Sequence, residues 1–478
     1  MKKSPLIIFP MLCLLNCWIA EADDWAQFRG PNASGVSAGT DPLPTEFSLE
    51  SKLLWKAELG DGIGSAVIVD GLVFNTAMSG ETALAIFCHD GKTGKQLWKT
   101  EVPTGELPRI TPPNSHASST PVADGTNVYM YFSTIGLIAF DAKTGNEAWR
   151  HELPQPAFLM DWGSGSSPIL YDGMVIFARD DDLNSYMVAV DAITGKEIWK
   201  TPRPDMLAGY AIPVMCTAGG RTDLVVAGSG KLKGYDPKTG KEIWTCNTLL
   251  RTVMTSPVVA DDHIYVAVQS YGDNTRTLKY ALLQWLDTNQ DGKLARDEMP
   301  EEFYERFDKS DKNKDKMIDE LEIETAFQHE DNLVGGGNTI QAVKGGGKGD
   351  VTKTHLAWNI DNKSPSNLSS PLVFNDRVHV VKSGGISSCF DAKTGDEIWG
   401  RTRLRNFGDY YASPIAADGK IYIAGRNGFV VVIDDADELK ILAKNDVGEE
   451  ILATPSIADG RIYVRGRESI FCFSNEAK

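Results

Sequence analysis

Short apolar strands alternate with tight polar turns along almost the whole chain. Each copy opens with a small residue, usually just before a proline, then runs through a few apolar residues into a turn and a second apolar strand. Eight copies are recognisable, beginning at Ser118, Ser166, Thr255, Ser369, Ala412 and Ala453, with weaker ones at Gly64 and Ala211. Because one such unit cannot bury its apolar side chains alone, the pattern predicts copies that pack against one another.

A second motif completes each unit: an aspartate, a Thr-Gly pair, and a tryptophan eight residues after the aspartate. It begins at Asp90, Asp141, Asp191, Asp236 and Asp391. The glycine supplies the positive φ of a tight hairpin, so the aspartate ends one strand and the tryptophan lies in the next. Each unit is therefore predicted to form four antiparallel strands. The whole chain is predicted to form an all-β, eight-bladed β-propeller. We expect the tryptophans to pack between neighbouring blades.

The ends of the repeat array predict how the ring closes. The last copy holds three strands before Ser474, and residues 52–58 read as an isolated strand near the start. We expect this N-terminal strand to complete the last blade and so remove the exposed sheet edges. Trp244 and Trp358 stand 114 residues apart, whereas the other steps are 41 to 51. This spacing predicts an insertion at residues 270–337 in blade 5, between propeller segments 23–269 and 338–478.

Composition and charge restrict where the protein is expected to be located and which partners it is expected to bind. Residues 1–22, with two lysines, an apolar stretch and a small-x-small end, are predicted to be a signal peptide, so we expect a periplasmic or secreted protein. A lipid anchor at Cys17 is the alternative. The formal charge of −17 argues against a nucleic-acid partner, because phosphates bind basic surfaces.

The insertion carries the clearest chemical motif, two twelve-residue segments that fit the EF-hand calcium loop. The expected ligands of the first are the side chains of Asp287, Asn289, Asp291 and Glu298 and the carbonyl of Lys293. Those of the second are the side chains of Asp311, Asn313, Asp315 and Glu322 and the carbonyl of Met317. The second loop has Lys316 where Gly292 makes the sharp turn of the first, so we expect it to bind more weakly. Residues around 280–286, 300–307 and 320–327 show helical periodicity, and Leu294 and Ile318 are expected to pair between the loops.

The longer connections between the predicted strands fall on one face of the ring, where binding residues usually lie. Polar and aromatic residues there are Asn114, His116, Asp161, Trp162, Asp180, Asp181, Asp182, Arg403, Arg405, Asp409, Tyr410 and Tyr411. We expect the three consecutive aspartates to form a solvated loop. His116 and Asp161 precede innermost strands and are expected near the central channel.

The paired motifs closely resemble the pyrroloquinoline quinone (PQQ)-like propeller repeat, which occurs in quinoprotein alcohol dehydrogenases and in the outer-membrane-assembly propeller lipoprotein. The opening segment from Asp24 to Ser37 is similar to the start of exported bacterial propellers of that superfamily, some of which carry EF-hand insertions. For a dehydrogenase, the resemblance implies an adjacent cysteine pair over the quinone and a Glu, Asn and Asp set around a central calcium ion. The chain has no Cys-Cys pair, and its calcium motif lies in the insertion.

These observations favour an exported, calcium-binding propeller that binds or scaffolds a protein partner, with no catalytic residues assigned. A PQQ-dependent alcohol or sugar dehydrogenase is the alternative. We expect a monomer with calcium as its cofactor, and the departures from the dehydrogenase pattern argue against PQQ.

Overall fold

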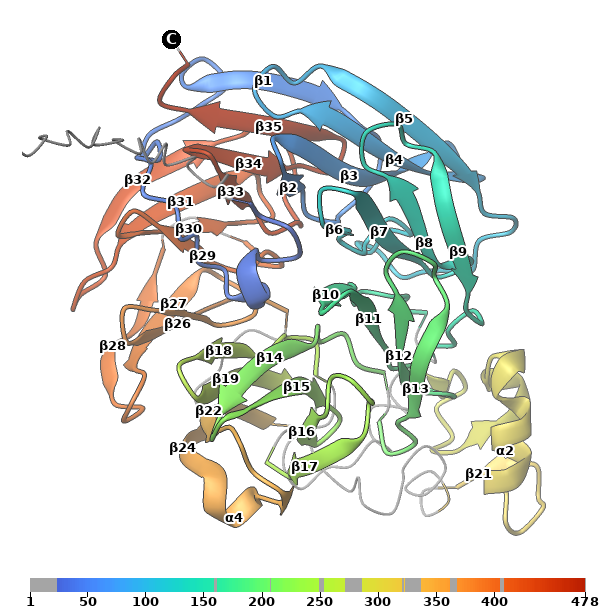
Figure 1. Ribbon diagram of the computed structural model, residues 1–478. Helices are drawn as coiled ribbons and strands as arrows, with labels where there is room; N and C mark the ends of the chain where they lie inside the picture. The colour runs from blue at the N-terminus through green and yellow to red at the C-terminus, as the bar shows by residue number, and fades with distance from the viewer. Residues whose placement is uncertain are drawn as a thin grey trace, which may run out of the picture.

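Eight β-sheets surround a central axis in the computed structural model (Figure 1). The structure describes residues 24–158, 161–206, 208–248, 253–270, 286–319, 322, 337–361, 368–404 and 408–477. Seven of the eight sheets have four strands and one has five. The predicted eight-bladed propeller is therefore confirmed.

Within each blade the strands follow chain order from the innermost outward, except that blade 8 takes the N-terminal β1 as its outermost strand and the sheet of blade 4 gains a fifth strand from later in the chain. Blades 1 to 4 consist of β2 (Val67–Val69), β3 (Leu72–Ser79), β4 (Ala83–Asp90) and β5 (Gln96–Pro103); β6 (Val122–Ala123), β7 (Asn127–Phe132), β8 (Gly136–Asp141) and β9 (Glu147–Glu152); β10 (Ile169–Tyr171), β11 (Met174–Arg179), β12 (Tyr186–Asp191) and β13 (Glu197–Pro202); β14 (Val214–Ala218), β15 (Arg221–Gly228), β16 (Lys231–Tyr235) and β17 (Glu242–Cys246). Blades 5 to 8 consist of β18 (Val258–Ala260), β19 (His263–Ser270), β22 (Gly337–Lys344) and β24 (Leu356–Asp361); β25 (Leu372–Phe374), β26 (Arg377–Lys382), β27 (Ile386–Asp391) and β28 (Glu397–Arg403); β29 (Ile415–Ala417), β30 (Lys420–Ala424), β31 (Phe429–Asp434) and β32 (Ile441–Asp446); β33 (Ser456–Ala458), β34 (Arg461–Arg465), β35 (Ser469–Ser474) and the N-terminal β1 (Leu53–Glu58).

The ring is closed by its own N-terminal strand, as the sequence predicts. Strand β1 lies antiparallel to β35, with Trp55 opposite Cys472 and Glu58 opposite Ser469. The last blade thus receives its outer strand from the start of the chain, which leaves no gap between blades 8 and 1.

The repeat motif positions each indole against the next blade. In the turn after β12, the Asp191 carboxylate accepts hydrogen bonds from the amide and hydroxyl of Thr194, and Gly195 adopts a φ of +68°. The indole of Trp149, from the preceding blade, lies over Gly195 and donates its Nε1 proton to the carbonyl of Ala192 at 2.9 Å. Equivalent indole-to-carbonyl bonds are made by Trp55, Trp98, Trp199, Trp358 and Trp399. The predicted packing of the tryptophans between blades is confirmed for these positions.

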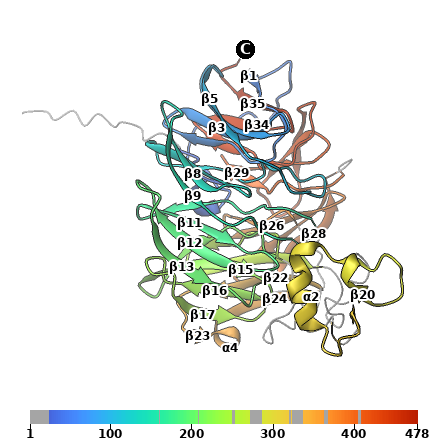
Figure 2. The same ribbon diagram turned by 90° about the vertical axis from the view of Figure 1, so that its right-hand side faces the viewer.

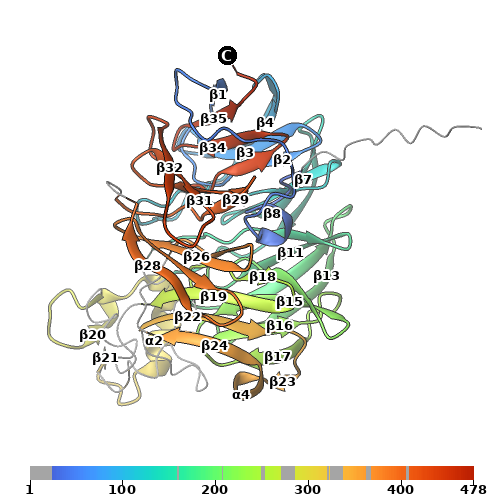
Figure 3. The same cartoon turned by 90° about the vertical axis from the view of Figure 1, so that its left-hand side faces the viewer.

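Trp244 is buried in an apolar cluster that includes residues of blade 5, but its hydrogen bond departs from this pattern. Blade 5 has a glycine-rich segment where blades 1 to 4 and blade 6 carry the Thr-Gly turn. The indole of Trp244 instead lies against Gly234 of its own blade and donates to Asp223 Oδ2 at 2.8 Å. Two further elements cover this edge, the strand β23 (Gly349–Asp350), parallel to β17, and the short helix α4 (Thr352–His355). Figure 3 shows both beside β17 at the outer rim.

The N-terminal segment before β1 crosses the middle of the ring. Trp25 forms a β-bridge with Ile68 of blade 1, and Val36 forms one beside Ala416 of blade 7. Between them lies the 3₁₀ helix η1 (Pro31–Ala33), which Figure 1 shows inside the ring. Asn32 makes two 2.8 Å hydrogen bonds with the backbone of Met215 in blade 4. One segment therefore joins blades on opposite sides of the axis.

The insertion lies between β19 and β22, which are antiparallel neighbours in blade 5. Its described part holds the two-residue strands β20 (Leu294–Ala295) and β21 (Met317–Ile318), the 3₁₀ helices η2 (Arg296–Glu298) and η3 (Glu301–Phe303), and the helix α2 (Tyr304–Ser310). Figure 2 views the ring edge-on and shows these elements together on one side. Their apolar cluster also contacts Leu183 of blade 3 and Ala157 in the connection between blades 2 and 3. The guanidinium of Arg306 donates to the carbonyl of Asp182, so the insertion of blade 5 docks against blade 3.

Candidate functional site

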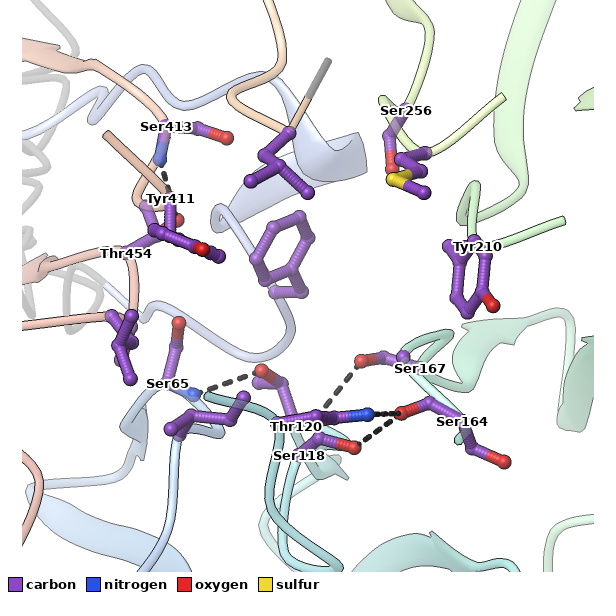
Figure 4. Close-up of a pocket in the computed structure, with 18 of the residues that line it drawn as sticks. Ser65, Ser118, Thr120, Ser164, Ser167, Tyr210, Ser256, Tyr411, Ser413 and Thr454 are labelled. Atoms are coloured by element: carbon purple, nitrogen blue, oxygen red, sulfur yellow. Dashed lines mark hydrogen bonds between the residues drawn. The ribbon is translucent and has the colours of Figure 1, made fainter. Parts of the chain in front are cut away.

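A cavity of ≈ 380 Å³ lies on the central axis, at the face that carries the long connections between blades. Figure 4 shows side chains of many blades converging on it. Its polar lining consists mainly of hydroxyl groups, contributed by Ser65, Thr111, Ser118, Thr120, Ser164, Ser167, Ser256, Ser370, Ser413 and Thr454. Its aromatic lining consists of Phe28, Trp162, Tyr210 and Tyr411.

Seven of these hydroxyls occupy one repeat position, two residues before each innermost strand. We call the set Ser65, Thr120, Ser167, Ser256, Ser370, Ser413 and Thr454 the hydroxyl belt; blade 4 has Ile212 at this position. Backbone amides of one blade donate to belt oxygens of the next: Ser65 to Thr120 (2.9 Å), Thr120 to Ser167 (2.9 Å), Ile212 to Ser256 (3.0 Å), Ser256 to Ser370 (2.9 Å), Ser370 to Ser413 (3.0 Å) and Ser413 to Thr454 (3.0 Å). The belt therefore links most neighbouring blades at the channel wall.

The sequence pattern predicts the belt position only as the start of a strand. Six of the seven belt residues stand directly before a proline, which holds them extended and lacks an amide proton of its own. The recurring hydroxyl before proline was thus a readable signal for a ring of polar groups around the axis. That these groups line a cavity depends on the closed ring.

The belt hydroxyls keep hydrogen-bonding capacity after these contacts. A hydroxyl has one proton and two lone pairs, and an incoming amide uses one lone pair. Within the described part of the chain, none of the belt hydroxyls donates to a protein acceptor. The hydroxyl oxygen of Ser65 is buried and has no partner among the described residues.

Aromatic rings form the remaining walls. The ring of Tyr210 stacks on Phe158, with centroids 5.8 Å apart and planes 18° from parallel. Figure 4 shows Tyr210 and Tyr411 on opposite sides of the cavity. Phe28, which belongs to the segment that crosses the ring, also lines it. Nothing near Phe28 in the sequence indicates that this segment reaches the cavity.

The part of the cavity lining that the structure describes is uncharged. Among the described residues that line it there is no aspartate, glutamate, lysine, arginine, histidine or cysteine. These described residues therefore offer no cation to balance an anionic ligand, no carboxylate to hold a metal ion, and no general base beside a nucleophile.

A smaller cavity of ≈ 50 Å³ adjoins the first, since Ser118 and Ser164 line both. Its charged and polar residues include Arg109, His116 and Asp161 from the ring and Glu302 from the insertion. Burial lowers the pKa of His116, against the raising effect of Asp61.

The residues named from the sequence divide into several groups. Asn114, Trp162 and Tyr411 line the central cavity, and His116 and Asp161 line its smaller neighbour. Tyr410 is buried, whereas Arg403 and Asp409 are exposed. Arg405 lies outside the described residues.

The expectation of a solvated aspartate run was wrong for two of its three members. Asp180 and Asp181 are buried and form ion pairs with buried arginines: Arg203 lies 2.8 Å from Asp180, and Arg179 lies 3.0 Å from Asp181. Burial raises the pKa of Asp180, against the lowering effect of Arg203. Three consecutive acids read as a surface loop, because the sequence does not reveal that the arginines fold against them.

The two acidic loops of the insertion have matching backbone contacts. In the first, Gly292 N donates to Asp287 Oδ2 and Thr288 N to Glu298 Oε1, both at 2.8 Å. In the second, Lys316 N donates to Asp311 Oδ2 at 2.9 Å and Lys312 N to Glu322 Oε1 at 2.7 Å. These four contacts occupy equivalent positions in the two loops.

The two loops meet through a short β-bridge, in which Leu294 lies opposite Ile318. Gly292 has a φ of +81° and Lys316 one of +67°, so the lysine occupies the left-handed region that the motif requires at this point. Burial raises the pKa of Glu298, but amide hydrogen bonds from Ala295 and Thr288 outweigh it, so the pKa is lowered. Within the described residues, no three acidic, histidine or cysteine side chains come together as a metal-binding group. The helical segments expected at 280–286 and 320–327 lie mostly outside those residues.

Comparison with known proteins identifies the repeat. A family model described as outer membrane protein assembly factor BamB matches residues 47–206, 184–281 and 382–478. A quinoprotein ethanol dehydrogenase of Pseudomonas aeruginosa is 28% identical over 237 residues, which are 44% of this chain and 37% of that protein. The assembly factor BamB of Kangiella koreensis is 26% identical over 217 residues, 44% of this chain and 49% of that protein.

Among solved structures, BamB from Moraxella catarrhalis superposes with a TM-score of 0.55 at 15% identity, covering 89% of this chain and 97% of that one. At this identity the likeness concerns the fold. The matched region spans half or less of the two curated relatives. In the described part of the chain, no helix is long and apolar enough to cross a membrane.

Proposed function

The chain belongs to the PQQ-like repeat propellers of the BamB family, and we propose on that basis that it is an exported, calcium-binding propeller that holds a protein partner and catalyses no reaction. The absence of charged groups among the described residues that line the central cavity carries this proposal. A catalytic site needs groups that move protons or stabilise developing charge, and the described lining residues supply only neutral hydroxyls and aromatic rings.

The alternative, a PQQ-dependent alcohol or sugar dehydrogenase, agrees poorly with the same lining. PQQ carries three carboxylates, and burying them without a cation costs several kcal/mol for each charge, on the order of the penalty for any unpaired buried ion. The described lining holds no arginine or lysine to pair with them and no carboxylate to hold a metal ion beside the quinone. The residues present therefore do not fit PQQ.

We place calcium in the insertion. Asp287, Asn289, Asp291 and Glu298, with the carbonyl of Lys293, would hold one ion, and Asp311, Asn313, Asp315 and Glu322, with the carbonyl of Met317, a second. The oxygen donors are those that calcium prefers, and the paired loops already share the turn that places their carboxylates beside the backbone amides. A bound ion would neutralise neighbouring carboxylates and rigidify the insertion, which we also call the lobe.

Isothermal calorimetry with calcium chloride tests this placement. We expect two binding events in the wild-type protein, with the first loop binding more tightly because Lys316 is strained at positive φ. Asp287→Asn should remove the tighter event and Asp311→Asn the weaker one. Exposed Asp172→Asn, in a turn on the ring, is the control. Absence of heat in the wild type would refute calcium binding.

The position of the insertion favours a protein partner on the face that holds the cavity. The lobe docks on blade 3 through an apolar cluster and through Arg306, and Glu302 lines the small cavity beside the central one. A rigid projection beside a recess offers a shaped surface that a partner can contact.

Crosslinking followed by mass spectrometry tests the partner. The wild-type protein and the Asp287→Asn, Asp311→Asn double variant are compared in native envelope, with calcium and with a chelator. We expect one partner whose crosslinks map to the lysines of the insertion, such as Lys309 and Lys312, and which is lost on chelation and in the variant. Oxidation of alcohols or sugars by purified protein supplied with PQQ and calcium would overturn the non-catalytic function.

We further propose a monomer in the periplasm or the medium, with residues 1–22 as a signal peptide, residues 270–337 as the calcium-binding lobe, and residues 23–269 and 338–478 as the ring. Residues 1–22, including Cys17, lie outside the described residues. Mass spectrometry of the mature protein from cell fractions tests the cleavage and would reveal a lipid if Cys17 carries one.

A further inference from the structure

We propose that the central cavity binds a neutral carbohydrate and holds a pyranose unit without changing it chemically. This inference goes beyond the proposed function. None of the described residues that line the cavity belongs to the insertion, so calcium binding and carbohydrate binding can fail independently.

The charge of the cavity excludes several ligand classes. An anionic ligand would lose its hydration without meeting a lysine, arginine or histidine among the described lining residues. A cationic ligand would likewise meet no carboxylate. A wholly apolar ligand would displace water from the belt hydroxyls that it covers and leave their protons without acceptors, at a cost for each one. A neutral ligand rich in hydrogen-bonding groups remains.

Sugar hydroxyls match the unused hydrogen-bond donors and acceptors of the hydroxyl belt. Thr120, Ser167, Ser256, Ser370 and Ser413 each accept one amide proton, and each still has one proton to donate and one lone pair. A sugar hydroxyl also has one proton and spare lone pairs, so it can accept from one belt residue and donate to the next. The buried, unpartnered hydroxyl of Ser65 is a further position at which a ligand oxygen would complete the hydrogen bonding.

The aromatic walls supply the other element of carbohydrate recognition. A pyranose has a face of C–H groups, which packs on an aromatic ring, while its hydroxyls point outward. Tyr210 and Tyr411 lie on opposite sides of the cavity, and the stack on Phe158 holds the ring of Tyr210 in place (Figure 4). Trp162 lines the same space. The volume of ≈ 380 Å³ lies within the range of small-molecule sites, roughly 300–1,000 Å³.

Binding is measured by isothermal calorimetry with glucose, galactose, N-acetylglucosamine and cellobiose, with PQQ and gluconate as anionic probes and hexane-1,6-diol as a probe without a pyranose ring. Intrinsic tryptophan fluorescence gives a second readout because Trp162 lines the cavity. We expect at least one neutral sugar to bind with a dissociation constant roughly in the micromolar to millimolar range. Gluconate and the diol should not bind, and chelation of calcium should leave sugar binding unchanged.

Variants place the sugar in the cavity. Tyr210→Ala and Tyr411→Ala should each weaken binding by about three- to tenfold, the value of one aromatic contact. Tyr210→Phe keeps the ring and should bind almost as the wild type does. Tyr171→Ala, outside the cavity lining, is the matched control. Circular dichroism spectra confirm that the variants fold.

Three results would overturn the proposal. One is the absence of binding by every neutral sugar. Another is sugar binding that neither tyrosine variant weakens. The third is stoichiometric binding of PQQ, since it would show that the cavity accepts the charged ligand that its lining is argued to reject.

Discussion

The docking of an indole on a glycine of the next blade can be tested at a single carbon atom. Gly195 has a φ of +68°, and a Cβ placed there would lie 2.6 Å from the ring of Trp149. That indole is only 8% exposed and also bonds to the carbonyl of Ala192, so it has little room to move. Gly195→Ala therefore adds two costs, the left-handed backbone of an alanine and the overlap with the indole.

The two costs can be separated, because the same blade offers a matched control. Gly173 has a φ of +76°, and a Cβ there would meet no atom within 4 Å. Gly173→Ala should destabilise the protein by about 1–2 kcal/mol, from backbone strain alone. Gly195→Ala should cost that amount and about 1–3 kcal/mol more for overpacking.

The assay is equilibrium urea unfolding followed by far-ultraviolet circular dichroism, with the shift in midpoint multiplied by the common slope. We expect Gly195→Ala to lower the midpoint by at least twice as much as Gly173→Ala. Trp149→Leu should narrow this difference, because the smaller side chain vacates the space over Gly195. Equal losses for the two glycine variants in the wild-type background would refute indole docking as a source of stability.

Three further predictions concern buried charges and the docked lobe. Arg203→Met should lower the free energy of unfolding in urea by about 3–5 kcal/mol, because it leaves Asp180 buried without its partner. The control Arg401→Met, at an exposed position, should cost little. Similar losses for the two variants would contradict the buried Arg203–Asp180 ion pair. Burial lowers the pKa of His89 from 6.5 to about 4. Between these two pH values the unfolded chain therefore binds a proton at His89 that the folded chain does not. The free energy of unfolding should fall as the pH drops from 6.5 to 4, by up to about 1.4 kcal/mol per pH unit. His89→Phe should flatten that part of the pH profile, and an unchanged slope would argue against a buried neutral imidazole. Arg306→Ala should speed hydrogen exchange in α2 and in the loop near Ala157, because it removes the hydrogen bond to the carbonyl of Asp182. Exchange in blade 7 should stay unchanged. An equal change in exchange at all these places would contradict docking of the insertion on blade 3.

Local chemistry explains why the structure of the repeat can be predicted from the sequence alone. Each Asp-to-Trp motif sets its own turn through a carboxylate, a threonine and a glycine at positive φ, all within a few residues. Closure by residues 52–58 followed from counting strands, since the last copy held only three. Trp244 shows the limit: the partner turn is absent from blade 5, and its indole bonds to Asp223 of its own blade.

The candidate site was less accessible to sequence reasoning. His116, Trp162 and Tyr411 were named because they lie on the face with long connections, and the structure places them at the two cavities. Phe28 was not, because nothing near it in sequence indicates that the N-terminal segment crosses the ring. The burial of Asp180 was missed for the same reason, since Arg203 lies 23 residues away along the chain.

The sequence by itself determined the unit, the number of blades, the closing strand and the position of the insertion. These features depend on interactions between residues that are close in the chain or that recur at a fixed spacing. Only the tertiary structure decided that seven hydroxyls converge on one axis, that Phe28 joins them, and that a lobe inserted in blade 5 docks on blade 3. Those contacts join residues separated by much of the chain, and the ring had to close before their distances were fixed.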